Sequence, residues 1–250
     1  VVGRPEAGLW SRLTGLPGTN VAYSGLGAVG SAVWADIRDG KFNAELRVAV
    51  PDASTDELRQ RVASGAAPER ILLVMVESLG LPASPEVRQE LFAGFAKDPI
   101  GTRYVRRTGA VPFVGATTSG ELRELCSVTA THRTVLRIDH SGCLPAILAS
   151  QGYRTVSVHG NEPFVFDRDK WYGPIGFRSQ LWSRDLPVEH CGSIVRGSCD
   201  EPVANIVAKL VQDAADTRRF VYWLTLSTHW PVDADYGKGR FPCVVARLSP

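Results

Sequence analysis

A glutamate and a threonine, 40 residues apart, are the pair in this chain best suited to chemistry. Glu77 ends the apolar run 71–76, and Thr117 lies in a Gly-Ala-Thr-Thr turn that opens a helical pattern. In an open α/β sheet, the carboxyl ends of strands and nearby helix N-termini converge on the ligand crevice. A carboxylate and a hydroxyl brought together there can share a divalent metal, which makes the threonine a nucleophile. We therefore expect Glu77 and Thr117 to form one site.

Each member of this pair also has a purely structural interpretation. Glu77 could be a partly exposed glutamate at a strand end that makes an ordinary ion pair. The sequence Thr118-Ser119-Gly120-Glu121 fits the capping box S/T-x-x-E. That box would place Thr117 just outside the cap, where the helix dipole favours a negatively charged oxygen.

Three further polar residues follow later apolar segments. Arg168 could clamp a phosphate through two N–H groups, with a surface ion network over residues 167–170 as the alternative. His159 follows a β-rich run and belongs to the same polar group. His229 follows another apolar run and could hold a phosphoryl oxygen or protonate a leaving group, unless it is a hydrogen-bonded core histidine.

Strand and helix patterns alternate from residue 70 onward, which is typical of a doubly wound α/β sheet. Several of the predicted strands end in polar, chemically capable residues, so the site is expected along one edge of the sheet. The predicted strands are 71–76, 153–158 and 220–226. The predicted helices are 85–96, 118–125, 143–150 (closed by Gly152) and 200–212 (capped by Asp200).

Bulk properties exclude several classes of function. The net charge of +2 and the scattered basic residues make nucleic acid an unexpected partner. No apolar run approaches the roughly 20 residues that span a bilayer. A G-x-S-x-G elbow and a P-loop are both absent, so α/β-hydrolase and Walker-type nucleotide chemistry find no support.

Four of the five cysteines lie in pairs around short polar connections. Cys126 and Cys143 flank one such connection, and Cys191 and Cys199 bracket another. Two local disulfides in an oxidising compartment are the favoured interpretation, with free, partly buried thiols as the alternative. Cys243 is left over, which suggests a partner outside this chain.

Taken in order, these segments resemble the alkaline-phosphatase/sulfatase superfamily, and most closely its lipoteichoic-acid-synthase and phosphoglycerol- or phosphoethanolamine-transferase branch. The resemblance extends from about residue 70 to 235. It rests on residues 76–80, 115–117 with Glu121, 159–161, 168–169, 172–177 and 227–231. It implies an alkaline-phosphatase-like three-layer sandwich with a mostly parallel central sheet over residues 69–250, preceded by an N-terminal arm or linker over residues 1–68.

The resemblance also implies roles for individual residues. Glu77 becomes a ligand of a divalent metal ion, zinc or manganese, and Thr117 becomes both a metal ligand and the nucleophile. Four residues would bind the substrate: Arg168, His229, His159 and Phe166, the last at a position where tryptophan is common. Cys191 and Cys199 resemble a disulfide of periplasmic transferases. The C/S-x-P-x-R motif of sulfatases proper is absent, which argues against sulfate-ester hydrolysis.

The implied activity is transfer of a phospho-head group, phosphoglycerol or phosphoethanolamine, from a phospholipid to a cell-envelope glycan or lipid acceptor through a phospho-threonine. The reaction would take place on the periplasmic or extracellular face of the bacterial inner membrane. A phosphodiesterase or sulfatase-like hydrolase is one alternative, and an inactive binding remnant of the fold is another.

One departure from the superfamily pattern concerns the metal site. Members complete that site with an Asp-His pair on a later strand, whereas the sequence ends at Pro250 without one. Glu77 and Thr117 alone would leave zinc under-liganded, since zinc takes three or four protein ligands. We therefore expect a fragment truncated at the C-terminus, also lacking the N-terminal membrane anchor of lipid-using members.

Overall fold

The computed structural model describes residues 53–79, 84–93, 111, 116–192, 195–215 and 217–229. These residues fall in two units. One unit contains helix α5, Pro85–Phe92, whose N-cap Ser84 accepts a hydrogen bond from the Val87 N–H at 3.2 Å. Its start at Pro85 confirms the predicted position of that proline in the first turn. The other unit contains the sheet and every site residue discussed below.

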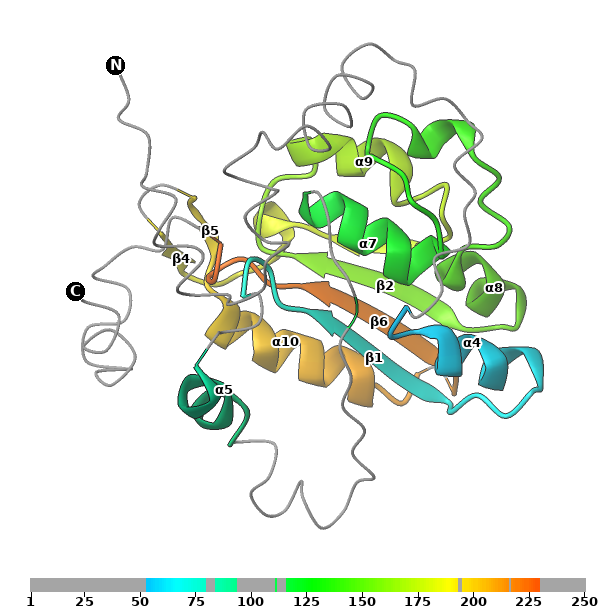
Figure 1. The fold of residues 1–250 in the computed structure, drawn as a ribbon, viewed down its shortest axis with the longest axis horizontal. Helices are drawn as coiled ribbons and strands as arrows, with labels where there is room; N and C mark the ends of the chain where they lie inside the picture. The colour runs from blue at the N-terminus through cyan, green and yellow to red at the C-terminus, as the bar shows by residue number, and fades with distance from the viewer. Residues whose placement is uncertain are drawn as a thin grey trace. The chain divides into compact units, whose positions relative to one another are not determined.

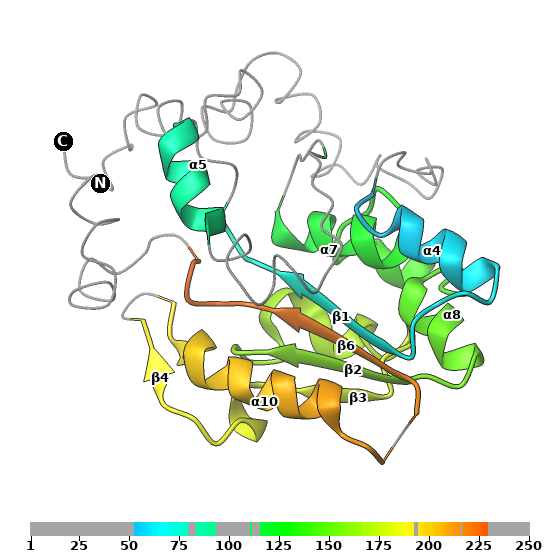
Figure 2. The same ribbon diagram turned by 90° about the horizontal axis from the view of Figure 1, so that it is seen from below.

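Four parallel strands form the central sheet, in the order β1-β6-β2-β3 (Figures 1 and 2). Their bounds are β1 Arg70–Met75, β6 Arg219–Leu224, β2 Arg154–His159 and β3 Ser179–Leu181. The two middle strands are buried almost throughout, as expected for a parallel sheet covered on both faces.

The register of the sheet brings three strand ends together. Met75 of β1 pairs with Leu224 of β6, and Leu224 pairs with His159 of β2. The segments that follow these residues therefore leave the sheet at the same edge. This alignment is what turns polar residues far apart in sequence into neighbours.

Helices cover both faces of the sheet, which gives three layers (Figures 1 and 2). Helices α4, α7, α8 and α9 pack around one apolar cluster with the sheet, and α10 packs on the other face. Their bounds are α4 Asp56–Ala63, α7 Thr117–Cys126, α8 Leu144–Ser150, α9 Arg168–Trp171 and α10 Asp200–Gln212.

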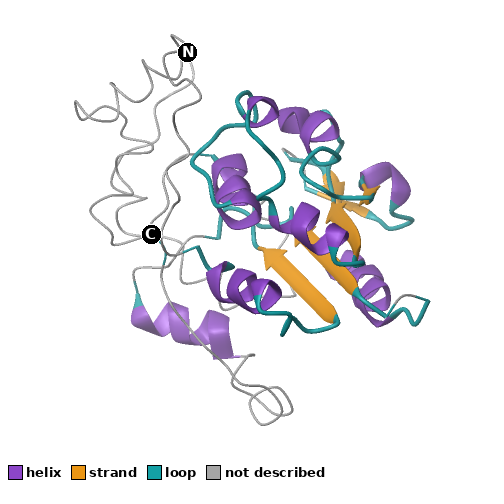
Figure 3. Ribbon diagram, turned by 90° about the vertical axis from the view of Figure 1, so that its right-hand side faces the viewer, coloured by secondary structure: helices purple, strands orange, loops and turns teal. Residues whose placement is uncertain are grey.

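Shorter elements complete the described part of the chain (Figure 3). Three single turns of 3-10 helix are η2 Val135–Arg137, η3 Val165–Asp167 and η4 Ser183–Asp185. A separate antiparallel pair joins β4, His190–Cys191, to β5, Gly197–Ser198. None of the helices in the described ranges is long and apolar enough to cross a membrane.

The predicted fold class is confirmed: the domain is α/β, with a parallel central sheet. The predicted helix end at Gly152 is also confirmed, because this glycine follows the C-cap Gln151 with φ of +83°. The predicted cap of α10 is wrong. Cys199 is the N-cap residue, and Asp200 is the first residue of the helix.

The expected boundary at residue 69 lies inside the packed structure. Helix α4 precedes that boundary, yet its Val62 is buried in the main apolar cluster. Thr55 donates a hydrogen bond from its hydroxyl to the carbonyl of Glu124 on α7 at 2.8 Å. Residues 53–68 therefore contribute to the core of the domain, while residues 1–52 lie outside the described part.

Both predicted disulfides are present. Cys126–Cys143 joins the end of α7 to the N-cap of α8, and Cys191–Cys199 joins β4 to the N-cap of α10. The first cross-link therefore holds two helix ends together, and the second holds the start of α10 to the small antiparallel pair. Cys243 lies outside the described residues.

Candidate active site at the carboxyl edge of the sheet

Glu77 lies two residues beyond the end of β1, and its side chain is only 3% exposed. The expectation of a partly exposed strand-end glutamate is therefore wrong. Burial raises the pKa of the Glu77 carboxyl, and the nearby charges of Arg168 and His229 together with a hydrogen bond from Thr117 offset only part of that increase. Its Oε2 atom is buried without a hydrogen-bond partner among the described residues. A carboxylate left in this state is costly unless a cation joins it.

Thr117 is the first residue of α7 and is half-buried. Its side chain reaches the Glu77 carboxylate, so the structure brings together the two residues that the sequence paired. The predicted capping box over residues 118–121 is wrong, because the helix already begins at Thr117 and the Glu121 side chain bonds elsewhere. Gly115 of the same turn lies outside the described residues.

The segment after β6 holds the backbone around Glu77. The Glu77 N–H donates to Thr225 Oγ1 at 3.0 Å, and the Thr228 hydroxyl donates to the Glu77 carbonyl. This segment is held in turn by Asp200, whose carboxylate accepts the N–H groups of Leu226 and Ser227. The sequence did not predict the two bonds to Glu77, because Thr225 and Thr228 lie more than 140 positions away from it.

Ser78 directly follows Glu77 and has φ of +57°, in the left-handed region that non-glycine residues rarely adopt. Such strained backbone persists where surrounding contacts hold it, and it occurs preferentially at functional sites. Here the bonds from residues 225–228 to Glu77 supply the contacts.

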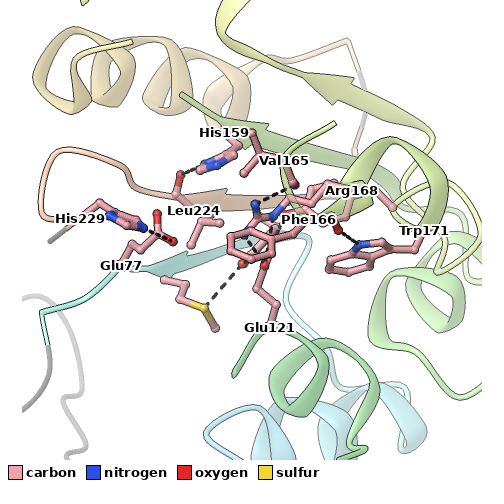
Figure 4. Close-up of polar contacts among 12 residues, drawn as sticks. Glu77, Glu121, His159, Val165, Phe166, Arg168, Trp171, Leu224 and His229 are labelled. Atoms are coloured by element: carbon pink, nitrogen blue, oxygen red, sulfur yellow. Dashed lines mark hydrogen bonds and ion pairs between the residues drawn. The ribbon is translucent and has the colours of Figure 1, made fainter. Parts of the chain in front are cut away.

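The two histidines of the site differ in environment (Figure 4). His229 Nε2 lies 3.8 Å from Glu77 Oε1, and the histidine side chain is 30% exposed, so it is not a core histidine. His159 is buried, and its Nδ1 lies 3.1 Å from the Leu224 carbonyl. Burial, assisted by the positive charge of Arg168, lowers the pKa of His159 to about 3. His159 is therefore neutral at physiological pH, with Nδ1 as the donor to that carbonyl and Nε2 as an acceptor.

Arg168 is buried and bonded to Glu121, so it does not belong to a surface ion network. Its Nε and Nη2 donate to Glu121 Oε2 at 3.1 and 2.8 Å. Burial lowers the pKa of Arg168, but the charge of Glu121 outweighs this effect and the net shift is upward. The neighbouring Lys170 and Asp167 do form an exposed ion pair at 2.6 Å.

Phe166 lies beside Arg168, whose guanidinium carbon is 5.3 Å from the centre of the phenyl ring. The Phe166 side chain is 38% exposed, and its carbonyl accepts a hydrogen bond from Trp171 Nε1 at 3.1 Å. Phe166 and Asp167 both have positive φ, 57° and 54°. This second strained stretch presents an aromatic ring at the surface next to the buried arginine.

Comparison with known proteins shows which family this chain matches. The sequence profile of the Sulfatase family matches residues 71–246. No curated protein sequence matches the chain. Solved structures are similar to parts of it at low identity, and three of them are described here.

The first of these structures is the lipoteichoic acid synthase LtaP from Listeria monocytogenes, with a TM-score of 0.39 and 19% identity over 46% of this chain and 29% of LtaP. The second is a protein of the alkaline phosphatase superfamily from Vibrio parahaemolyticus, with a TM-score of 0.43 and 16% identity over 67% of this chain and 42% of that protein. The third is the Streptococcus pyogenes phosphoglycerol transferase GacH in complex with sn-glycerol-1-phosphate, with a TM-score of 0.49 and 15% identity over 77% of this chain and 57% of GacH.

This chain therefore spans between about a third and somewhat more than half of the length of these proteins. The profile match, by contrast, covers more than half of the chain itself. The parallel sheet covered on both faces agrees with that match. The chain carries an enzyme domain and belongs to the sulfatase family.

Proposed function

We propose that this domain is a metal-dependent phosphotransferase. It would move a phospho-head group, phosphoglycerol or phosphoethanolamine, from a phospholipid to a glycan or lipid acceptor of the cell envelope. One observation carries the proposal. The buried Glu77 carboxylate, with an oxygen that lacks a partner among the described residues, lies against the hydroxyl of Thr117 at the start of a helix.

The residues present fit part of a divalent-metal site. The orphaned Glu77 Oε2 and the Thr117 hydroxyl are oxygen donors of the kind that zinc and manganese accept. Within the described ranges, no group of three or more His, Cys, Asp or Glu side chains surrounds a common point. Further ligands would have to come from elsewhere in the protein. A bound metal would supply Lewis-acid chemistry, withdrawing charge from the oxygens it contacts.

Residues of this chain would carry out the two steps of the transfer. The Thr117 oxygen, at the N-terminus of α7 where negative charge is favoured, loses its proton to solvent and forms a bond to phosphorus. The bond from phosphorus to the diacylglycerol oxygen breaks, and that oxygen takes a proton from His229. In the second step the acceptor hydroxyl returns a proton to His229 and bonds to phosphorus, and the bond from phosphorus to the Thr117 oxygen breaks. That oxygen then takes a proton back from solvent. Arg168, His159 and Phe166 are proposed to bind the head-group phosphate and its substituent.

The proposed location is the periplasmic or extracellular face of the bacterial inner membrane. Two disulfides within one domain are typical of proteins in oxidising compartments. A phospholipid donor also requires access to a membrane, which we propose is provided by an N-terminal anchor outside these 250 residues.

The test is a Thr117→Ala variant of the full chain, assayed with an aryl or lipid phosphodiester in the presence of Mn²⁺ or Zn²⁺. We expect loss of turnover by about 10³-fold or more, because no other group replaces the nucleophile. Ser119→Ala, in the same helical turn, is the control and should retain turnover. Retained turnover in Thr117→Ala would disprove the phospho-threonine mechanism.

Product analysis separates the alternatives. A new phosphodiester identifies a transferase, whereas a phosphomonoester formed with water identifies a hydrolase. If the whole protein binds neither metal, the domain is a non-catalytic binding remnant.

A further inference from the structure

We propose that Glu121 is a positioning residue of the active site: it holds the guanidinium of Arg168 by one edge and directs the opposite edge toward phosphate at the Glu77–Thr117 site. The inference rests on the proposed function, because it gives Arg168 a phosphate to bind.

The Glu121 carboxylate is fully buried, and each oxygen has its own partners. Oε2 accepts both N–H bonds from Arg168, at 3.1 and 2.8 Å. Oε1 accepts the hydroxyls of Tyr172 and Tyr222, the second at 3.1 Å. Burial raises the pKa of both tyrosines well above the ordinary value, so both hydroxyls stay protonated and act as donors. The carboxylate is therefore fixed from two directions.

Glu121 and the Val165 carbonyl accept three of the N–H groups of Arg168. A guanidinium has five N–H donors in a planar fork. Glu121 takes two of them on the Nε–Nη2 edge, and the Val165 carbonyl takes one from Nη1 at 3.2 Å. The two Nη atoms carry two further N–H groups, and donors of this kind suit bidentate binding of a phosphate.

This guanidinium lies close to the reactive pair. Figure 4 shows it between His159 and Glu121. The charge of Arg168 acts on both Glu77 and His159, which places the guanidinium within electrostatic reach of the site. Glu121 lies one helical turn after Thr117 on α7, so the two side chains share a face of that helix.

The Glu121 carboxylate thus connects the elements on which the site residues lie. Glu121 is on α7 with the nucleophile, Arg168 is on α9, and Tyr222 is on β6, whose continuation holds Glu77. Stability alone is a weak reason for such an arrangement, because apolar residues of similar volume often stabilise a core as well as a buried ion pair does. Orientation of a charged donor is a task that apolar residues cannot perform.

The test compares Glu121→Asp with Glu124→Asp in the full chain with Mn²⁺. Glu124 is a matched control: it is on the same helix, is 3% exposed and bonds Ser54, Thr55 and Arg123 rather than Arg168. Both variants keep the charge and withdraw the carboxylate by one methylene. We expect Glu121→Asp to weaken binding of inorganic phosphate by about 10- to 100-fold and to lower kcat/KM similarly, since small misplacements of binding groups have effects of this size. Glu124→Asp should change either quantity less than about threefold.

A second pair of variants covers the case in which Glu121→Asp does not fold. Tyr222→Phe removes one donor to Glu121 but leaves the bonds to Arg168 in place. Tyr153→Phe removes a comparable buried tyrosine hydroxyl, which bonds the Pro68 carbonyl at 2.8 Å rather than Glu121. We expect about threefold to tenfold weaker phosphate binding in Tyr222→Phe and no change in Tyr153→Phe.

Each outcome decides one question. Equal effects in the test and control variants would overturn the positioning role, even if the wild-type chain turns over phosphodiesters. Phosphate binding that depends on Glu121 without any turnover would retain the positioning role and reject the transferase. A wild-type chain that neither binds phosphate nor turns over phosphodiesters would overturn both.

Discussion

Two buried glutamates in this domain differ in how completely their carboxylates are bonded. Glu121 has an arginine and two tyrosine hydroxyls around it, and both of its oxygens have partners. Glu77 has one oxygen without a partner among the described residues, and its histidine neighbour is 3.8 Å away. Both side chains are almost inaccessible to solvent. Burial alone therefore does not distinguish a scaffold carboxylate from a reactive one.

The difference between the two glutamates lies in the carboxylate oxygen of Glu77 that has no partner among the described residues. A folded chain bonds the great majority of its buried polar atoms, so a carboxylate oxygen left without a partner requires an explanation. A cation that binds there is the simplest one, because it supplies the missing charge. At Glu121 the arginine already supplies that charge. We therefore propose Glu77 as the carboxylate that takes a ligand and Glu121 as the one that holds its surroundings in place.

The largest expected effect is that of Glu77→Gln on activity. Removing the charge should abolish binding of Mn²⁺ or Zn²⁺ and lower turnover by about 10³-fold or more. The free energy of unfolding of the metal-free protein should stay the same or rise by about 1 kcal/mol, because a buried, incompletely bonded charge is removed. Metal titration calorimetry and urea unfolding measure the two quantities. A marked loss of stability in metal-free Glu77→Gln would show that this carboxylate is structural.

The opposite pattern is expected for Glu121→Gln. This change leaves the buried Arg168 without its counter-charge, so the free energy of unfolding should fall by about 3–5 kcal/mol. Urea unfolding measures the loss. Combining the change with Arg168→Met should restore much of the stability, since no unpaired charge remains. If the double variant is as unstable as the sum of the single changes, the two residues are not energetically coupled.

A smaller effect should appear in the pH dependence of stability, through His159. Its pKa is about 3 in the folded state, against 6.5 in the reference state. Between these values the unfolded chain binds a proton that the folded chain does not, so the free energy of unfolding falls as the pH drops through this window. The slope contributed by this group is at most about 1.4 kcal/mol per pH unit. His159→Gln should remove that contribution.

The comparison for His159 is best made in a Glu77→Gln background. The folded-state pKa of Glu77 is raised, so above its unfolded value that group makes the protein less stable as the pH rises, which is the opposite sign. Unfolding measured from pH 7 to pH 4 with and without His159→Gln isolates the histidine. Identical slopes would mean that His159 titrates normally in the folded protein.

The sequence determined the main strands and helices of the domain, because apolar periodicity and turn residues act locally. It predicted the runs that became β1, β2 and β6, the helices α7, α8 and α10, and both disulfides. Since these strands are parallel and in register, the residues that follow them were predictable neighbours. Glu77 and Thr117 could be paired because the carboxyl ends of strands and nearby helix N-termini converge on the ligand crevice of an open α/β sheet.

Only the tertiary structure decided which carboxylate is bonded and which is not. Thr118 and Glu121 have the spacing of a capping box, and local rules cannot show that Arg168, 47 residues away, takes the glutamate instead. The same holds for Asp200, which resembles a helix cap in the sequence but accepts N–H groups from residues 26 and 27 positions later. Hydrogen bonds between distant segments depend on how the elements pack, and burial makes those bonds obligatory. The chemistry of a carboxylate is therefore set by partners that its local sequence does not contain.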